Sequence, residues 1–138
     1  MEELSYKVRI SALWLLHIVA FFAYRTLAVS EGATEVSLLG NDEFATYLLV
    51  AMAFAFLSLT LTSRPNRSTN IIAGAIFGVA QLIMLADGIV GYASATFNLM
   101  TGASFVIMAS VIWFAYKWPK AASIGSREKT LVDEAQRV

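Results

Sequence analysis

The sequence predicts an all-α fold, an integral membrane four-helix bundle with both termini in the cytoplasm. Of its 138 residues, 58% are hydrophobic and 14% are charged, whereas soluble domains carry roughly 45–50% apolar and about 25% charged residues. Four apolar stretches are each long enough, at about twenty residues, to cross a hydrocarbon core of about 30 Å as a helix. Basic residues fall in every second segment between them, which predicts the orientation of the bundle.

The four predicted helices cover about residues 10–29, 44–62, 71–92 and 97–118. Pro65 follows the second helix and Pro119 the fourth, and proline cannot continue a helix. We therefore expect a membrane domain over residues 1–120 and a polar cytoplasmic tail over 121–138.

The basic residues predict the topology of these helices. Three of the five segments outside the apolar stretches contain lysine or arginine: Lys7 and Arg9, then Arg64 and Arg67, then Lys117, Lys120, Arg127, Lys129 and Arg137. The two connections between them contain no lysine or arginine. Because cytoplasmic segments are enriched in basic residues, the two termini and the second connection are predicted to be cytoplasmic.

The third stretch, residues 70–92, carries the most informative residues. Gly74 and Gly78 form a GxxxG pattern, which allows a neighbouring helix backbone to approach closely. Gln81 shares that glycine face, whereas Asp87 lies well off it. A carboxylate within a membrane segment is costly, so Asp87 is expected to have a partner, water or a function.

Arg25 is the other charge within an apolar segment, and it is predicted to lie at the depth of Asp87, roughly 22–24 Å from the cytoplasmic edge. An ion pair would hold the first and third helices in register. The alternative is an outward-facing polar pocket that binds a ligand or a proton. Its further members would be polar and aromatic residues at the same level: Tyr24, Glu43, Tyr47, Tyr92, Asn98 and Thr101.

His17 and Gln81 form a second candidate pair, closer to the cytoplasmic side. A neutral hydrogen bond between these side chains would satisfy two polar groups on different helices. Histidine can also carry protons near neutral pH, so a relay is the alternative to a structural role. On a helical wheel of the first predicted helix, Arg25 lies about 80° from His17, so the two polar pairs need not share one cavity.

Several kinds of chemistry are disfavoured by the composition. The chain has no cysteine and a single histidine, which excludes disulfides, thiolate catalysis and multi-histidine metal centres. There is no P-loop, GxSxG or HExxH motif. The sequence therefore predicts no catalytic residue, metal or cofactor. Its formal net charge of zero gives no reason to expect nucleic acid as a partner.

Three stretches, Ser11–Tyr24 (SALWLLHIVAFFAY), Arg64–Gly78 (RPNRSTNIIAGAIFG) and Ser110–Pro119 (SVIWFAYKWP), resemble a family of small, uncharacterised four-helix bacterial membrane proteins, a domain of unknown function. The resemblance implies a bacterial plasma membrane and a four-helix bundle, and supplies no activity. The first helix of that family carries an asparagine and an acidic residue close after a tyrosine. Here Arg25 follows Tyr24, so no functional residue is transferred.

Three classes of function agree with these features. The first, which we favour, is a non-enzymatic protein that binds a small amphiphile or lipid, or acts as an accessory or sensor subunit. The second is a small transporter or channel, in which four helices would need to oligomerise to enclose a pathway. The third is a membrane enzyme acting on a quinone or lipid. The expected partners are membrane lipids, further copies of the chain or a larger membrane complex.

Overall fold

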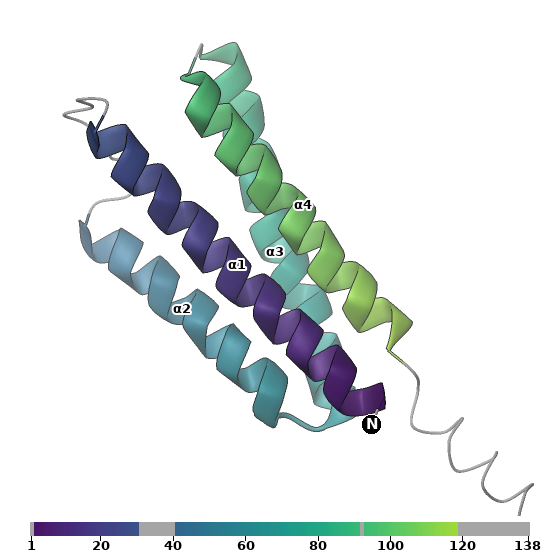
Figure 1. Ribbon diagram of the computed structural model, residues 1–138. Helices are drawn as coiled ribbons and strands as arrows, with labels where there is room; N and C mark the ends of the chain where they lie inside the picture. Colours follow the sequence, from purple (N-terminus) through teal and green to yellow (C-terminus); the bar gives the residue numbers. More distant parts are fainter. Residues whose placement is uncertain (1, 31–40, 92, 119–138) are drawn as a thin grey trace, which may run out of the picture.

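The computed structural model describes residues 2–30, 41–91 and 93–118, and within them the fold is an all-α bundle of four helices, as predicted. The helices are α1 (Glu2–Ser30), α2 (Asn41–Thr60), α3 (Ser63–Val90) and α4 (Ala95–Lys117). They run alternately up and down, so the start of α1, the α2–α3 connection and the end of α4 share one end of the bundle (Figure 1). The predicted tail over 121–138 lies outside the described residues.

The helices extend further at this end than the apolar stretches indicated. α1 begins at Glu2 rather than near residue 10, and α3 begins at Ser63 rather than near residue 71. Pro65 lies in the first turn of α3, where a missing N–H costs no helical hydrogen bond. The N–H of Asn66 closes this turn on the carbonyl of Thr62 at 3.0 Å. Residues 63–70, predicted as part of a connection, are therefore helical and belong to the bundle.

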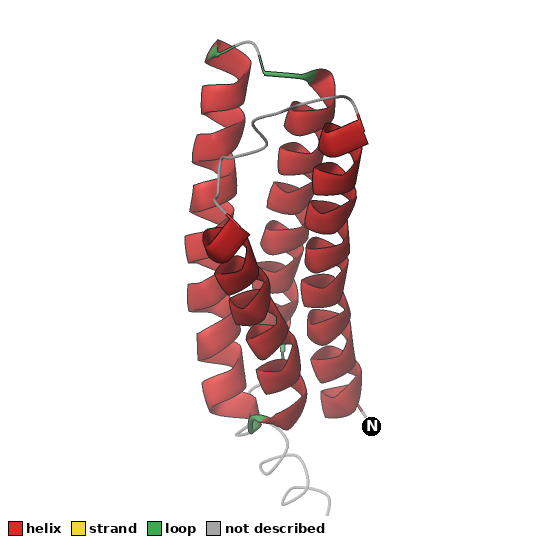
Figure 2. Ribbon diagram, turned by 90° about the vertical axis from the view of Figure 1, so that its left-hand side faces the viewer, coloured by secondary structure: helices red, strands yellow, loops and turns green. Residues whose placement is uncertain are grey.

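The pairs of neighbouring helices in the bundle do not pack equally closely. α1 packs along both α2 and α4, and α3 packs along α4, whereas α2 and α3 touch sparsely. α1 and α3 consequently lie on a diagonal of the bundle. α2 is also the shortest helix and begins well short of the end at which α3 joins α4 (Figure 2). The side of the bundle formed by α2 and α3 is thus its most weakly packed side.

A repeat of alternating four- and three-residue steps explains which residues face inward. Along α4 and the Trp118 that follows it, every member of this repeat is buried: Phe97, Thr101, Ser104, Met108, Val111, Ala115 and Trp118. On α1 it gives Ile10, Trp14 and His17, each 0% exposed. An average step of 3.5 residues keeps one seam facing the partner helices, as in coiled coils.

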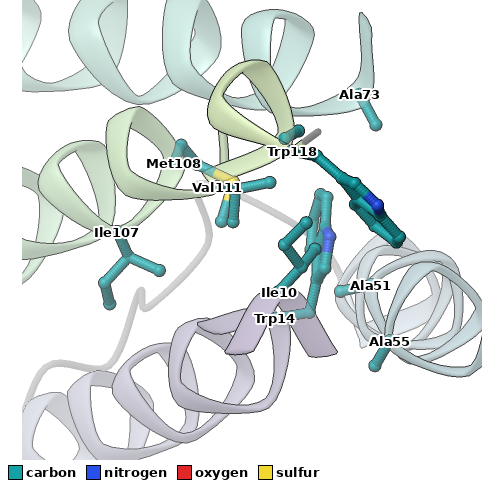
Figure 3. Packing of buried hydrophobic residues seen from close by; sticks show 10 residues of the cluster. Ile10, Trp14, Ala51, Ala55, Ala73, Ile107, Met108, Val111 and Trp118 are labelled. Carbon is teal, nitrogen blue, oxygen red and sulfur yellow. The ribbon is translucent and has the colours of Figure 1, made fainter. Parts of the chain in front are cut away.

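The glycine face of α3 packs closely against a neighbouring helix, as predicted, and that helix is α4. A Cβ added at Gly74 would lie 2.9 Å from Cγ1 of Ile112, and one added at Gly78 would lie 3.6 Å from Cβ of Met108. Trp14, Ile10 and Trp118 belong to one buried apolar cluster and lie close together (Figure 3).

The polarity of the bundle is inverted relative to a soluble protein. Its surface exposes large apolar side chains on all four helices, such as Leu49, Ile76 and Val106. His17, Asn70 and Gln81 are at most 1% exposed. Three described helical spans are long and apolar enough to cross a membrane, Leu4–Leu27, Ser63–Val90 and Ala95–Lys117, and the apolar part of α2, Ala45–Thr60, is shorter. Together these features indicate a membrane protein.

Candidate functional site

The centre of the bundle contains a hydrogen-bonded group from three helices, His17 of α1, Tyr47 of α2 and Gln81 of α3. Nε2 of Gln81 donates to the Tyr47 hydroxyl at 3.1 Å, and the same hydroxyl is hydrogen-bonded to Nε2 of His17. The predicted pair of His17 and Gln81 thus lies within one group, but Tyr47 stands between the two side chains. Tyr47, expected in a ring at the outer level, belongs instead to this group, which we call the polar centre.

Aromatic rings surround the polar centre. The Phe77 ring lies 6.1 Å from the His17 ring and 5.3 Å from the Tyr47 ring, measured between centroids. The Phe21 ring lies 4.7 Å from that of Tyr47. Trp14 presents an edge contact to His17 at 6.3 Å. The three polar side chains are therefore held in apolar surroundings, where an unmade hydrogen bond costs about 1–3 kcal/mol.

Two atoms of the polar centre have no hydrogen-bond partner within the described part of the chain, Nδ1 of His17 and Oε1 of Gln81. Because Gln81 donates to the Tyr47 hydroxyl oxygen, the hydroxyl proton is available for Nε2 of His17. A histidine that accepts at Nε2 and is neutral carries its hydrogen on Nδ1. The centre therefore presents one open donor and one open acceptor.

A second buried polar group, the asparagine cluster of Ser58, Asn66 and Asn70, lies where α2 turns into α3. Oδ1 of Asn70 accepts from Nε1 of Trp14 at 2.8 Å and from Oγ of Ser58 at 3.0 Å. Nδ2 of Asn70 donates to the Asn66 side chain at 2.5 Å, and Nδ2 of Asn66 donates to the Ser58 carbonyl at 2.6 Å. These bonds tie the α2–α3 turn to α1, which is a structural role.

An aromatic layer separates the asparagine cluster from the polar centre. The Trp14 ring stacks on Phe54 at 5.0 Å and meets Phe77 edge-on at 5.2 Å. Trp14 contacts both polar groups, since its Nε1 reaches Asn70 and its ring edge reaches His17. The buried polar residues consequently form two distinct groups rather than one continuous file.

The outer candidates lie at the far end of the bundle. Tyr24 of α1 meets the Phe97 ring of α4 at 5.6 Å, and Thr101 is buried. Nδ2 of Asn98 donates to the carbonyl of Ala93 at 3.4 Å, while Oδ1 of Asn98 has no partner in the described residues. Gly88 lies against Phe97 and Asn98. This end thus joins α1, α3 and α4 through rings and close backbone contact.

Arg25 is half-buried on α1, whereas Asp87 is exposed on α3. No ion pair between them is found among the described residues, and their helices lie diagonally across the bundle. The pairing of Arg25 with Asp87 and the outer pocket around them stay predictions. Two further candidates, Tyr92 and the side chain of Glu43, lie outside the described residues.

Sequence reasoning missed the asparagine cluster and the bridging role of Tyr47. Asn66 and Asn70 are four residues apart, so they share a face once α3 is known to begin at Ser63. The signal for Tyr47 was its spacing from the inward-facing residues of α2, since Tyr47, Ala51 and Ser58 fit the same seam repeat.

No group of three histidine, cysteine or acidic side chains that could hold a metal ion is present in the described residues. No family model matches the chain, and no curated protein and no solved structure matches it either. The resemblance drawn from the three helical stretches accordingly stays a prediction.

Proposed function

We propose that this chain is a small, non-enzymatic, multi-pass membrane protein that binds an amphiphile through one polar group at the polar centre. The observation that carries the proposal is the pair of open atoms, Nδ1 of His17 and Oε1 of Gln81, on side chains that are at most 1% exposed. A hydroxyl group both donates and accepts, so a single hydroxyl matches the open donor and the open acceptor.

The surroundings of the polar centre favour an amphiphile over a water-soluble ligand. Around it lie aromatic rings, and beyond them the exposed apolar side chains of the helices. A ligand entering from the side crosses this apolar shell, which suits a molecule that is apolar apart from one polar group. The sparse contact between α2 and α3 makes that side the expected entrance.

The same contacts favour binding over a continuous pathway. A transporter or channel needs polar groups along a path across the bundle. Here the rings of Trp14, Phe54 and Phe77 pack together between the asparagine cluster and the polar centre. Binding requires only the hydrogen bonds that the centre can make. An accessory or sensor subunit could use such a site, because a ligand between α2 and α3 would alter their weak contact.

For the location, we propose the bacterial plasma membrane with both termini in the cytoplasm. Lys7 and Arg9 are near the start of α1, Arg64 and Arg67 are near the start of α3, and Lys117 is the last residue of α4. These three helix ends lie at one end of the bundle (Figure 1), which supports this orientation. The chain has no cysteine, so single cysteines can report it. Thr62→Cys should be protected from an impermeant thiol reagent in intact cells, and Ala95→Cys should be labelled. The reverse pattern would contradict the orientation.

The binding proposal can be tested by extracting the purified protein and measuring retained amphiphiles by mass spectrometry. Gln81→Leu removes the open acceptor and should lose the retained molecule. Thr101→Val is the matched control, because it also replaces a buried polar group, at 5% exposure, but in the outer half. It should retain the molecule. Equal retention by both folded variants, or none by the wild type, would contradict the proposal.

A further inference from the structure

Three cations lie against aromatic rings at the end of the bundle where α1 begins and α4 ends. Cζ of Arg9 lies 5.8 Å from the Phe114 ring centroid, and Cζ of Arg67 lies 5.6 Å from that of Tyr116. Nζ of Lys117 lies 4.5 Å from the Trp113 ring centroid. The cations come from α1, α3 and α4, and all three rings belong to the last turns of α4. We call these six residues the basic collar.

The collar is accessible and cationic. Arg9 and Lys117 are exposed, as are Trp113 at 56% and Tyr116 at 67%. Among the residues whose side chains the structure describes, none of the three cations pairs with a carboxylate. Contact with a ring face uses the charge of an arginine but not its N–H donors, which remain suited to an anion.

The position of the collar fits a particular partner. Tryptophan and tyrosine favour the boundary between hydrocarbon and headgroups, so Trp113 and Tyr116 mark the headgroup level. Arg9 and Arg67 reach the rings of α4 from two sides, so phosphate oxygens at this level would meet donors on both flanks. Arginine binds phosphate in a bidentate manner.

We propose that the basic collar binds headgroups of anionic phospholipids on the flanks of α4, in the leaflet at this end of the bundle. The site uses no residue of the polar centre, so it is independent of the amphiphile proposed there. It also differs from a general attraction between a basic end and an anionic surface, because it assigns the contact to the ring-bound cations rather than to the total charge.

A test compares lipid selectivity in bilayers of equal parts phosphatidylglycerol and phosphatidylcholine, using native mass spectrometry of the protein released from them. The wild type should retain phosphatidylglycerol in preference to phosphatidylcholine. Arg9→Gln/Arg67→Gln should lower this preference by roughly fivefold or more, given the usual contribution of a basic residue at an anionic surface. Lys7→Gln/Arg64→Gln removes the same charge from the same end and should change the preference much less, because neither cation belongs to the collar and long-range attraction is screened by salt.

Three results of this test would overturn the proposal. An equal loss in the two double variants would show that only total charge matters, and no preference in the wild type would remove the site. Arg9→Lys/Arg67→Lys keeps both charges, so it still tests the site if the glutamine variant fails to fold. It should lose part of the preference, because lysine lacks the bidentate fork. Full retention by this variant would also contradict the proposed headgroup contact.

Discussion

Nε2 of Gln81 donates a hydrogen bond of 3.1 Å to the hydroxyl of Tyr47, joining α3 to α2 where the two helices pack sparsely. Elsewhere in the bundle, α3 and α4 are joined by close glycine contacts, and α1 and α4 by ring contacts such as that of Tyr24 with Phe97. The α2–α3 side combines this polar contact with the ring contacts that Phe77 makes with Tyr47 and Phe54. A polar contact can be exchanged for one with a ligand, which gives this side its expected role as an entrance.

Tyr47→Phe should destabilise the protein, because it removes the hydroxyl shared by His17 and Gln81 and keeps the ring. The expected loss is about 1–2 kcal/mol, in line with hydrogen bonds between membrane helices and the cost of leaving buried partners unpaired. Unfolding in mixed detergent micelles measures it. Tyr116→Phe makes the same chemical change at a side chain that is 67% exposed and should stay within about 0.5 kcal/mol of wild type. Equal effects would contradict the role given to Tyr47.

Asn70→Leu should cost more, about 2–3 kcal/mol, since it breaks hydrogen bonds with Trp14, Ser58 and Asn66 together. Trp14→Phe removes only one of these hydrogen bonds, so the part of its destabilisation that comes from lost hydrogen bonds should be smaller. Ser68→Ala, at an exposed position of the same helix, is the control. The same unfolding assay applies. A neutral Asn70→Leu would show that the cluster does not stabilise the α2–α3 turn.

Gly88→Ala should disturb the outer half of the bundle. An added Cβ would lie 2.5 Å from Oδ1 of Asn98 and 2.6 Å from Cε1 of Phe97, so both side chains, or the helix that carries residue 88, must shift. The expected destabilisation is about 1–3 kcal/mol. At Gly102 an added Cβ meets nothing within 4 Å, so Gly102→Ala should be neutral or stabilise by up to about 1 kcal/mol. If thermal unfolding ranks the two variants in reverse, the packing described here is wrong.

Asp87→Asn tests the ion pair predicted with Arg25. Because Asp87 is exposed and is not paired with Arg25 among the described residues, the free energy of unfolding should change by less than about 0.5 kcal/mol. The ion pair predicts a different result. In that case Asp87→Asn and Arg25→Gln would each destabilise, and the exchanged double variant Arg25→Asp/Asp87→Arg would restore stability.

The apolar stretches were sufficient to predict four helices, because a membrane helix needs about twenty apolar residues whatever its neighbours are. They could not predict where α1 and α3 begin. Residues such as Glu2 and Ser63 are polar, and their helical state depends on turns and caps outside the hydrocarbon core. From the sequence, Pro65 predicts the end of a helix, but proline is equally compatible with the first turn of the next one.

The polar site was predicted in part for a related reason. Depth along a helix follows from residue counting, so the common level of His17 and Gln81 could be predicted. Which helices are neighbours could not be predicted in this way, because the order of the helices around the bundle is set by packing. α1 and α3 are diagonal, so a side chain of α2, Tyr47, completes the contact that the depth estimate assigned to a direct pair.

His17 is the only histidine of the chain, so its ring nitrogens can be observed by ¹⁵N NMR without overlap. We predict a neutral imidazole with hydrogen on Nδ1 and with Nε2 accepting from Tyr47. This signature should change in Tyr47→Phe and be retained in Tyr116→Phe. Adding 1-decanol, an amphiphile with one hydroxyl, should shift Nδ1 in the wild type. Hydrogen on Nε2, or no response to either Tyr47→Phe or decanol, would contradict the polar centre as a binding site.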